Sequence, residues 1–114
     1  MRFKRPRAAR YPFIAPTTLT DLESGRQTPA NTCDLSLFGC QVAAGNATPL
    51  GKRIRIKILH NGESFEASGR VVDVRSATSA GIVFTKVGEQ CQLVLDKWIA
   101  LLRDKKTARQ IVSS

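Results

Sequence analysis

The 114-residue sequence has no long hydrophobic run, few acidic residues and no pattern typical of a catalytic centre. No stretch approaches the roughly 18 consecutive apolar residues of a membrane-spanning helix. The basic N-terminus also has no apolar region of the kind that a signal peptide contains. The nine acidic residues are scattered, and there is no nucleophile elbow, H-E-x-x-H pair or phosphate-binding P-loop. We therefore expect a cytoplasmic binding protein that is not an enzyme.

Cysteine and histidine are scarce as well. Cys33, Cys40 and Cys91 form no C-x-x-C pair, and His60 is the only histidine. An odd number of widely spaced thiols argues against a disulfide framework, and the lack of imidazole ligands argues against a zinc site. We expect small buried thiols, no metal and no cofactor. His60 precedes an Asn-Gly turn, where a solvent-facing loop residue fits better than a general base.

Positive charge, by contrast, is in excess, with 18 basic residues, a formal net charge of +9 and a pI near 10.2. Five of these cations lie within the first ten residues, with no acid among them: Arg2, Lys4, Arg5, Arg7 and Arg10. Such a block is normally solvated and flexible until it meets a polyanion. Arginine offers a planar fork that binds phosphate or the edge of guanine, or stacks on a base. A ligand-binding segment and a nonspecific basic tail both fit this pattern.

Residues 34–39, with the sequence DLSLFG, set an acid, a hydroxyl and a glycine at D-x-S-x-x-G spacing. On a β-strand, Asp34 and Ser36 would lie side by side, because side chains alternate between the two faces. Together they would present an acceptor and a donor to one planar ligand edge. Gly39 permits either a positive φ or a close backbone approach. The alternative is a strand end at which Asp34 and Ser36 bond the local backbone.

The periodicity of the remaining sequence predicts six strands and one helix. We expect strands near residues 14–22, 28–35, 38–42, 53–58, 64–75 and 80–85. In RIRIKI (53–58) the isoleucines and the cations alternate, Asn61-Gly62 signals a hairpin, and a change of parity predicts a bulge near Val71. Apolar residues at three- and four-residue intervals from Val87 to Leu102 predict an amphipathic helix. Its apolar stripe either packs over an open end of the barrel or forms a groove for a partner.

The aromatic residues bear on nucleic-acid binding. Four occupy positions that fit a core: Phe38, Phe65, Phe84 and Trp98. This placement argues against the exposed stacking platform of a barrel that binds single strands. Tyr11 and Phe13 either plug the base of the barrel or stack on a ligand. Because basic residues continue along the predicted strands, nucleic acid and acidic membrane surfaces stay open as partners.

Antiparallel strands joined by short turns and closed by one helix indicate a small β-barrel of the SH3-like, OB-like or a related kind. The length and the 42% apolar content fit one domain. The basic segment at residues 5–10, followed by D-x-S-x-x-G, resembles the PilZ family of cyclic di-GMP receptors. The resemblance continues through residues 51–56, 69–72 and 80–84 and the helix around Trp98.

This resemblance implies a mainly β fold, a six-stranded antiparallel PilZ-type β-barrel with a C-terminal amphipathic helix. The expected division is a flexible basic segment at residues 1–12, the barrel and helix at 13–106 and a frayed tail at 107–114. It also implies a stand-alone receptor for a bacterial second messenger, cyclic di-GMP, that passes its signal to a protein partner. The implied ligand-binding residues are Arg5, Arg7, Arg10, Asp34, Ser36 and Gly39. The arginines would clamp phosphates and guanine edges, while Asp34 and Ser36 face a guanine and Gly39 lets the turn approach the ligand.

The arginine segment departs from the family's R-x-x-x-R signature, because no two arginines stand four residues apart. If Arg5 and Arg10 take the outer positions of the extended signature, Pro6 stands where the second arginine is expected. Arg7 is then the natural substitute. Two alternatives stay open: a degenerate PilZ adaptor that acts through protein contacts without nucleotide, and a basic barrel that binds nucleic acid nonspecifically.

Overall fold

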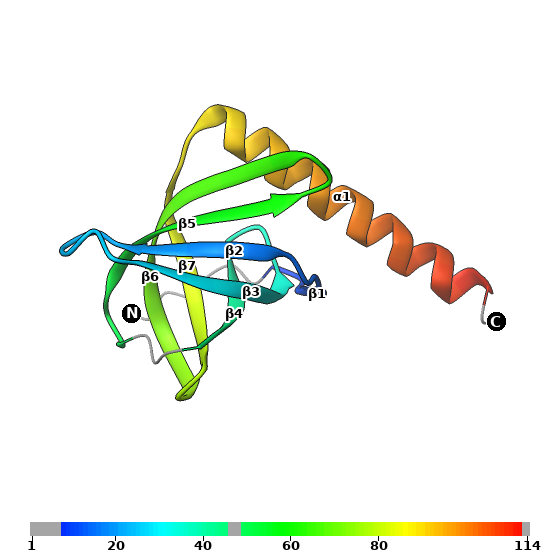
Figure 1. Cartoon of the computed structure of the whole chain (residues 1–114). Coiled ribbons are helices and arrows are strands. Elements are labelled where there is room, and N and C mark those ends of the chain that lie inside the picture. Colours follow the sequence, from blue (N-terminus) through cyan, green and yellow to red (C-terminus); the bar gives the residue numbers. More distant parts are fainter. Residues whose placement is uncertain (1–7, 46–48, 113–114) are drawn as a thin grey trace, which may run out of the picture.

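The computed structural model describes the backbone of residues 8–45 and 49–112, and side chains up to residue 105. Within these described residues, seven strands precede one long helix (Figure 1). The strands are β1 (Tyr11–Pro12), β2 (Pro16–Asp21), β3 (Gln27–Leu35), β4 (Gly39–Ala44), β5 (Arg53–His60), β6 (Glu63–Ser76) and β7 (Ser79–Val87), and the helix is α1 (Glu89–Val112).

The strands form one antiparallel sheet in the order β1-β3-β2-β5-β6-β7-β4, and β4 also pairs with β3. That last pairing closes β2 to β7 into a six-stranded barrel. The short β1 is an extra strand that pairs with the end of β3. The predicted six-stranded antiparallel barrel with a C-terminal helix is therefore confirmed.

Strict alternation produces the two faces of β5. Ile54, Ile56 and Ile58 are buried in the barrel, whereas the three cations between them are exposed. Asn61 and Gly62 follow with φ values of 51° and 76° and close the hairpin to β6. Positive φ at both central residues is the requirement of a type I′ turn, which an Asn-Gly pair meets readily. The predicted hairpin is confirmed.

Two register shifts govern which side chains of β3 and β6 reach the outer surface. One lies between Val71 and Asp73, where the parity of the sequence predicted a bulge, and the other between Thr32 and Asp34. A bulge adds one residue to a strand and re-aims the side chains that follow it. Val71 and Leu35 therefore stay in the core, while Asp34 and Asp73 lie on the outer face.

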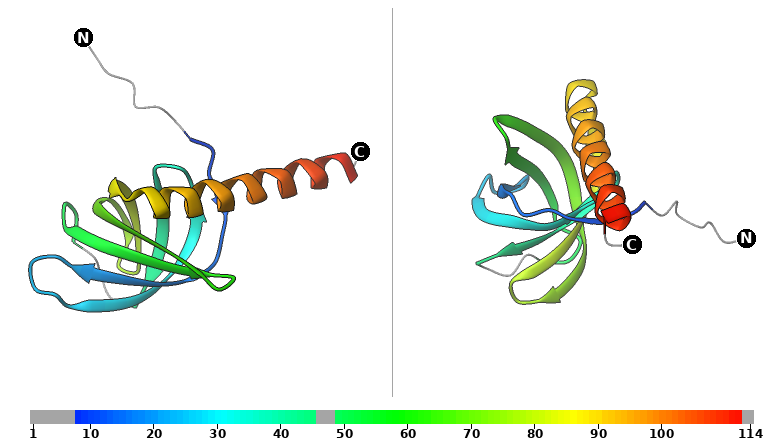
Figure 2. Two further views of the ribbon diagram at one scale, coloured as in Figure 1. Left: turned by 90° about the horizontal axis from the view of Figure 1, so that it is seen from above. Right: turned by 90° about the vertical axis from the view of Figure 1, so that its right-hand side faces the viewer.

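Helix α1 packs against β6 and β1 and then extends beyond the barrel (Figures 1 and 2). Leu95, Trp98 and Ile99 are buried, so the apolar stripe of the helix packs on the barrel. The helix continues to Val112, past residue 107, where we expected fraying to begin. From Glu89 to Val112 there is no glycine or proline to end it. Within the described residues, no helix is long and apolar enough to cross a membrane.

Tyr11 and Phe13 both belong to the buried core, so they plug the barrel. The ring of Phe13 lies 5.5 Å from that of Trp98 and 4.7 Å from that of His60. His60 is consequently half-buried among aromatic rings, and the expectation of a solvent-facing loop residue is wrong. The reason is that β5 runs to residue 60, which places the imidazole against the helix.

Two other expectations about burial are wrong. Phe38 is 47% exposed, because β4 begins only at Gly39 and Phe38 belongs to the preceding turn. Cys33 is exposed, because it is the extra residue of the β3 bulge. Cys40 is buried, as the sequence predicted, whereas Cys91 is only half-buried.

Candidate functional site

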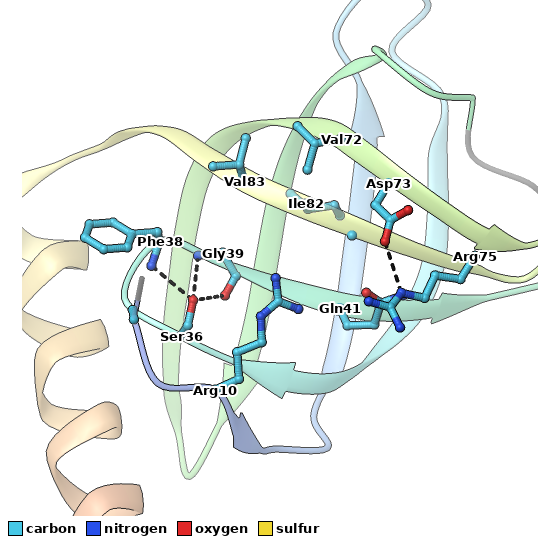
Figure 3. Close-up of a pocket in the computed structure, with 12 residues that line it drawn as sticks. Arg10, Ser36, Phe38, Gly39, Gln41, Val72, Asp73, Arg75, Ile82 and Val83 are labelled. Carbon is cyan, nitrogen blue, oxygen red and sulfur yellow. Dashed lines mark hydrogen bonds and ion pairs between the residues drawn. The ribbon is translucent and has the colours of Figure 1, made fainter. Parts of the chain in front are cut away.

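A hollow of about 620 Å³ opens on the outer face of the barrel, where β4 and β7 lie side by side (Figure 3). Five parts of the chain contribute to its walls: the segment before β1, the turn that leads into β4, the start of β4, the end of β6 and the middle of β7. Its polar and charged lining residues are Arg10, Ser36, Gln41, Asp73 and Arg75. A hollow of this size is in the range of small-ligand pockets, about 300–1,000 Å³.

Four residues of neighbouring strands form one row across this hollow. Asp34 on β3 is opposite Gln41 on β4, and Gln41 is opposite Gly81 on β7. Gly81 in turn is opposite Asp73 on β6. Residues directly opposite each other project to the same face of a sheet. The row therefore carries a carboxylate at each end, and Gly81, which has no side chain, lies between the side chains of Gln41 and Asp73.

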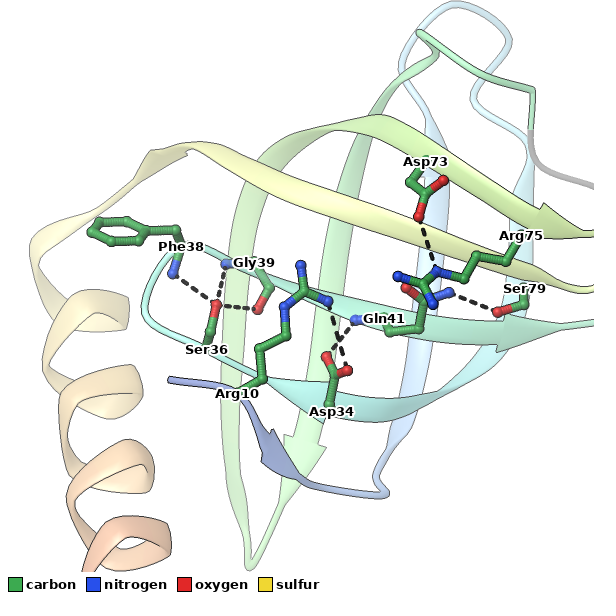
Figure 4. A network of polar contacts seen from close by, with 9 residues as sticks. All are labelled: Arg10, Asp34, Ser36, Phe38, Gly39, Gln41, Asp73, Arg75 and Ser79. Carbon is green, nitrogen blue, oxygen red and sulfur yellow. Dashed lines mark hydrogen bonds and ion pairs between the residues drawn. The ribbon is translucent and has the colours of Figure 1, made fainter. Parts of the chain in front are cut away.

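Asp34 lies next to Arg10 and Gln41, which line the hollow, and makes two contacts (Figure 4). Its Oδ1 accepts a hydrogen bond from the backbone N–H of Gln41 at 3.0 Å, and its Oδ2 lies 3.7 Å from Nη1 of Arg10. The side chains of Arg10 and Asp34 are 58% and 27% exposed. A long, solvent-exposed ion pair contributes little to stability. The guanidinium of Arg10 is therefore available to bind another anion.

Ser36 follows the end of β3 and is buried. Its Oγ accepts hydrogen bonds from the backbone N–H groups of Phe38 (3.2 Å) and Gly39 (3.1 Å), and donates to the carbonyl of Gly39 (3.2 Å). The expectation that Ser36 shares a strand face with Asp34 is wrong, because β3 ends at Leu35. Both side chains bond the local backbone, as in the alternative interpretation of the motif, and the hydroxyl fixes the turn.

Gly39 has no positive φ, so its role is the close backbone approach. A Cβ atom at this position would overlap the carbonyl oxygen of Ile82 on β7. The residue before Gly39 is also hydrogen-bonded to β7, since the N–H of Phe84 donates to the carbonyl of Phe38 at 2.8 Å. The D-x-S-x-x-G turn is thereby clamped to β7 at the rim of the hollow.

The opposite wall holds residues that the sequence analysis missed. Nε of Arg75 lies 3.0 Å from Oδ2 of Asp73, and Nε2 of Gln41 donates to Oγ of Ser79 at 2.7 Å. Gly81 was the signal that could have found this wall, because an isolated glycine inside a strand often marks a close approach of backbone or ligand. Of the six predicted site residues, the structure brings together Arg10, Asp34, Ser36 and Gly39. Arg5 and Arg7, like Pro6, lie outside the described residues.

Two observations limit the chemistry of this region. Burial, with a smaller contribution from the nearby carboxylate of Asp34, raises the pKa of the Cys40 thiol, so it stays protonated and unreactive. Among the residues that the structure describes, no group of three or more His, Cys, Asp or Glu side chains could hold a metal ion. What the hollow offers a ligand is hydrogen-bond acceptors and arginine forks.

Comparisons with known proteins agree with this architecture. The family model of the PilZ domain matches residues 2–101. The PilZ domain of CeSA from a cellulose-synthesizing bacterium is 18% identical with a TM-score of 0.64, over 86% of this chain and 98% of that one. The PilZ domain of YcgR from Escherichia coli, solved with c-di-GMP, is 18% identical with a TM-score of 0.70, over 97% and 99%.

A third similar structure is the inhibitor of motility MotI from Bacillus subtilis, at 16% identity and a TM-score of 0.70. The match covers 93% of this chain but only 55% of MotI. At these identities the structural likeness establishes the fold, and the predicted PilZ-type barrel is confirmed. The comparison with curated proteins found no match.

Proposed function

The chain belongs to the PilZ domain family, and from this premise we propose that it is a receptor for cyclic di-GMP. The ligand would bind in the hollow on the outer face of the barrel, at the edge formed by Arg10 and Asp34. The observation that carries the proposal is this Arg–Asp pair beside the D-x-S-x-x-G turn. Similarity to the YcgR domain that was solved with c-di-GMP supports it.

The chemistry of guanine matches the Asp34 carboxylate. Guanine presents N1–H and N2–H₂ donors on one edge, and a carboxylate can accept both. Adenine has an unprotonated N1 at the corresponding position, which would face the negative charge of Asp34 and be repelled. Asp34 would therefore select guanine over adenine. The backbone N–H of Gln41, which already bonds Oδ1, keeps the carboxylate oriented.

Arg10 would leave its long contact with Asp34 and bind a phosphate or the O6/N7 edge of a guanine, since these groups accept from the planar guanidinium fork. Arg5 and Arg7 would add further forks from the same segment. Ser36 and Gly39 would act by holding the turn at the rim of the hollow. Folding this segment onto the ligand would cost free energy, which would lower affinity and supply a conformational signal.

We extend the proposal to the output of the signal. A change in the arginine segment on ligand binding would be read by a separate protein partner. In this proposal the chain is a binding domain and catalyses no reaction.

Calorimetric titration of the full chain with cyclic di-GMP, GMP and a short oligonucleotide tests the proposal. We expect a cyclic di-GMP dissociation constant between high nanomolar and tens of micromolar, with much weaker binding of GMP. Arg10→Ala should weaken cyclic di-GMP binding by about 2–4 kcal/mol without unfolding the protein. Lys57→Ala is the matched control, because it removes an exposed cation from β5, whose residues do not line the hollow.

Each alternative function has its own outcome in this titration. Absence of heat and of a thermal shift at about 1 mM cyclic di-GMP, where even weak receptors respond, would favour the adaptor without nucleotide. Oligonucleotide binding that falls steeply between two salt concentrations would favour nonspecific nucleic-acid binding. If Lys57→Ala abolished cyclic di-GMP binding and Arg10→Ala left it unchanged, the site would lie on the basic strand.

A further inference from the structure

Two Arg–Asp pairs face each other across the hollow (Figure 4). Arg10 and Asp34 form one, and Arg75 and Asp73 form the other, with closest N–O distances of 3.7 Å and 3.0 Å. The two carboxylates occupy the ends of the single cross-strand row that runs through Gln41 and Gly81. Each carboxylate also comes directly after a β-bulge. The two walls therefore repeat the same arrangement of charges.

The Asp73–Arg75 pair is available to a ligand. Asp73 and Arg75 are 51% and 68% exposed, and an ion pair this exposed adds little to stability. The contact uses Oδ2 of the carboxylate and Nε of the guanidinium. The second carboxylate oxygen and the terminal amino groups of the fork can thus bind a ligand without breaking the pair.

Cyclic di-GMP is itself two-fold symmetric, with one guanine on each side of a single sugar–phosphate ring. Three strand spacings separate Asp34 from Asp73 along the row, about 14 Å before the curvature of the barrel shortens the gap. Of the two residues between them, Gly81 adds no side chain, and Gln41 is buried and lines the hollow. The hollow can therefore accommodate a ligand that presents the same chemical group at both ends.

We propose that Asp73 and Arg75 form a second guanine-binding pair, so that the two bases of cyclic di-GMP each meet one carboxylate and one arginine. The Asp73 carboxylate accepts from N1–H and N2–H₂ of the second guanine, and Arg75 donates to its O6 or to the adjoining phosphate. This inference rests on the proposed function, because it assigns the second half of the same site.

The test compares three cyclic dinucleotides that differ only in their bases: cyclic di-GMP, the mixed cyclic GMP–AMP and cyclic di-AMP. Asp73→Asn keeps the shape of the side chain but removes its charge. We expect this variant to bind cyclic di-GMP at least about tenfold more weakly, because a hydrogen bond to a charged acceptor is lost. Binding of the mixed ligand should change by no more than about twofold, because its single guanine still binds Asp34 and only one of two orientations is lost.

Asp34→Asn should show the same pattern, with the guanine of the mixed ligand bound at Asp73. In the double variant the advantage of the mixed ligand over cyclic di-AMP should disappear, a non-additivity that two separate guanine sites require. Asp104→Asn is the matched control, because it removes one exposed carboxylate from α1, and no side chain of α1 up to residue 105 lines the hollow. If Asp73→Asn does not fold, Arg75→Gln replaces the other residue of the pair and is tested with the same three ligands.

Equal weakening of all three ligands by Asp73→Asn would overturn the inference, since it would show an effect that does not depend on the base. The inference would also be overturned if Asp73→Asn bound cyclic di-GMP as tightly as the control Asp104→Asn does. In both cases Asp34-dependent binding of cyclic di-GMP would leave the proposed function standing. If the unmodified chain binds no cyclic dinucleotide, the proposed function and this inference both fail.

Discussion

Gly39 on β4 lies so close to the carbonyl oxygen of Ile82 on β7 that a Cβ atom at residue 39 would overlap it. The neighbour is backbone, so no side-chain rotation can relieve the overlap. Gly39→Ala should therefore lower the free energy of unfolding by about 3 kcal/mol or more, the upper end of the cost of overpacking. Urea denaturation measures this. Gly45→Ala is the matched control, because a Cβ there has no neighbour within 4 Å.

A substitution at Gly81 should change ligand affinity without changing stability. A Cβ at this position would lie 3.2 Å from Cβ of Asp73 and 3.4 Å from Oε1 of Gln41. These are tight contacts at a buried position, and their cost is offset by the about 0.5–1 kcal/mol by which alanine is favoured over glycine within a strand. Gly81→Ala should thus leave the melting temperature nearly unchanged but, by filling the floor of the hollow, weaken cyclic di-GMP binding about tenfold. Unchanged affinity in a folded variant would show that the ligand does not enter between Gln41 and Asp73.

The predictions from sequence succeeded where a local pattern dictates the structure. The alternation of residues 53–58 and the Asn61-Gly62 pair specify β5 and its turn with little help from the rest of the chain. Phe38 was wrongly predicted to lie in a strand. The hydroxyl of Ser36 accepts hydrogen bonds from the backbone N–H groups of Phe38 and Gly39 and forms a turn, so β4 begins only after Phe38.

The candidate site was predicted only in part for a different reason. Asp34 and Ser36 are recognisable because they stand two residues apart in one motif. Asp73 and Arg75 come near Arg10 only through the closure of the barrel, which places β6, β7, β4 and β3 next to one another. No spacing in the sequence encodes that long-range pairing, so this wall of the hollow emerges only from the fold.

Ser36 should matter more for stability than for binding. Its Oγ makes three hydrogen bonds within the turn, and it is buried. Ser36→Ala leaves the N–H groups of Phe38 and Gly39 without this acceptor, at an expected cost of about 1–3 kcal/mol in the free energy of unfolding. The loss of ligand affinity should be smaller than that of Arg10→Ala. The opposite ranking, a stable Ser36→Ala variant that no longer binds, would show that the hydroxyl contacts the ligand directly.

Acid should destabilise the turn between β2 and β3 through Asp21. The backbone N–H of Glu23 donates to Asp21 at 2.8 Å, and Nζ of Lys52 lies 3.2 Å from its other oxygen, which together lower the pKa of this carboxyl below 3.8. Because the folded-state pKa is below the unfolded one, the stabilisation is complete above the unfolded pKa and is lost as the pH falls through the folded value. Asp21→Asn should therefore flatten the decline of unfolding free energy from about pH 5 to pH 2. Urea denaturation across this range, with Asp104→Asn as the control, measures the difference, and parallel curves would contradict the assignment.

Pro6 stands where the family signature has an arginine, and its replacement tests how the arginine segment works. Proline fixes φ and holds the preceding residue extended, and it supplies no cation. Pro6→Arg should tighten cyclic di-GMP binding by about 1 kcal/mol or more through a new charge-assisted hydrogen bond. If Arg7 has taken over the missing role, Arg7→Ala should be severe in the natural chain and mild once Pro6→Arg is present, because the two arginines then share one function. Calorimetry of the four variants measures this coupling. Equal losses in both backgrounds would show that Arg7 does not substitute for the missing arginine, and Arg5 and Arg10 would then be the ligands that this segment contributes.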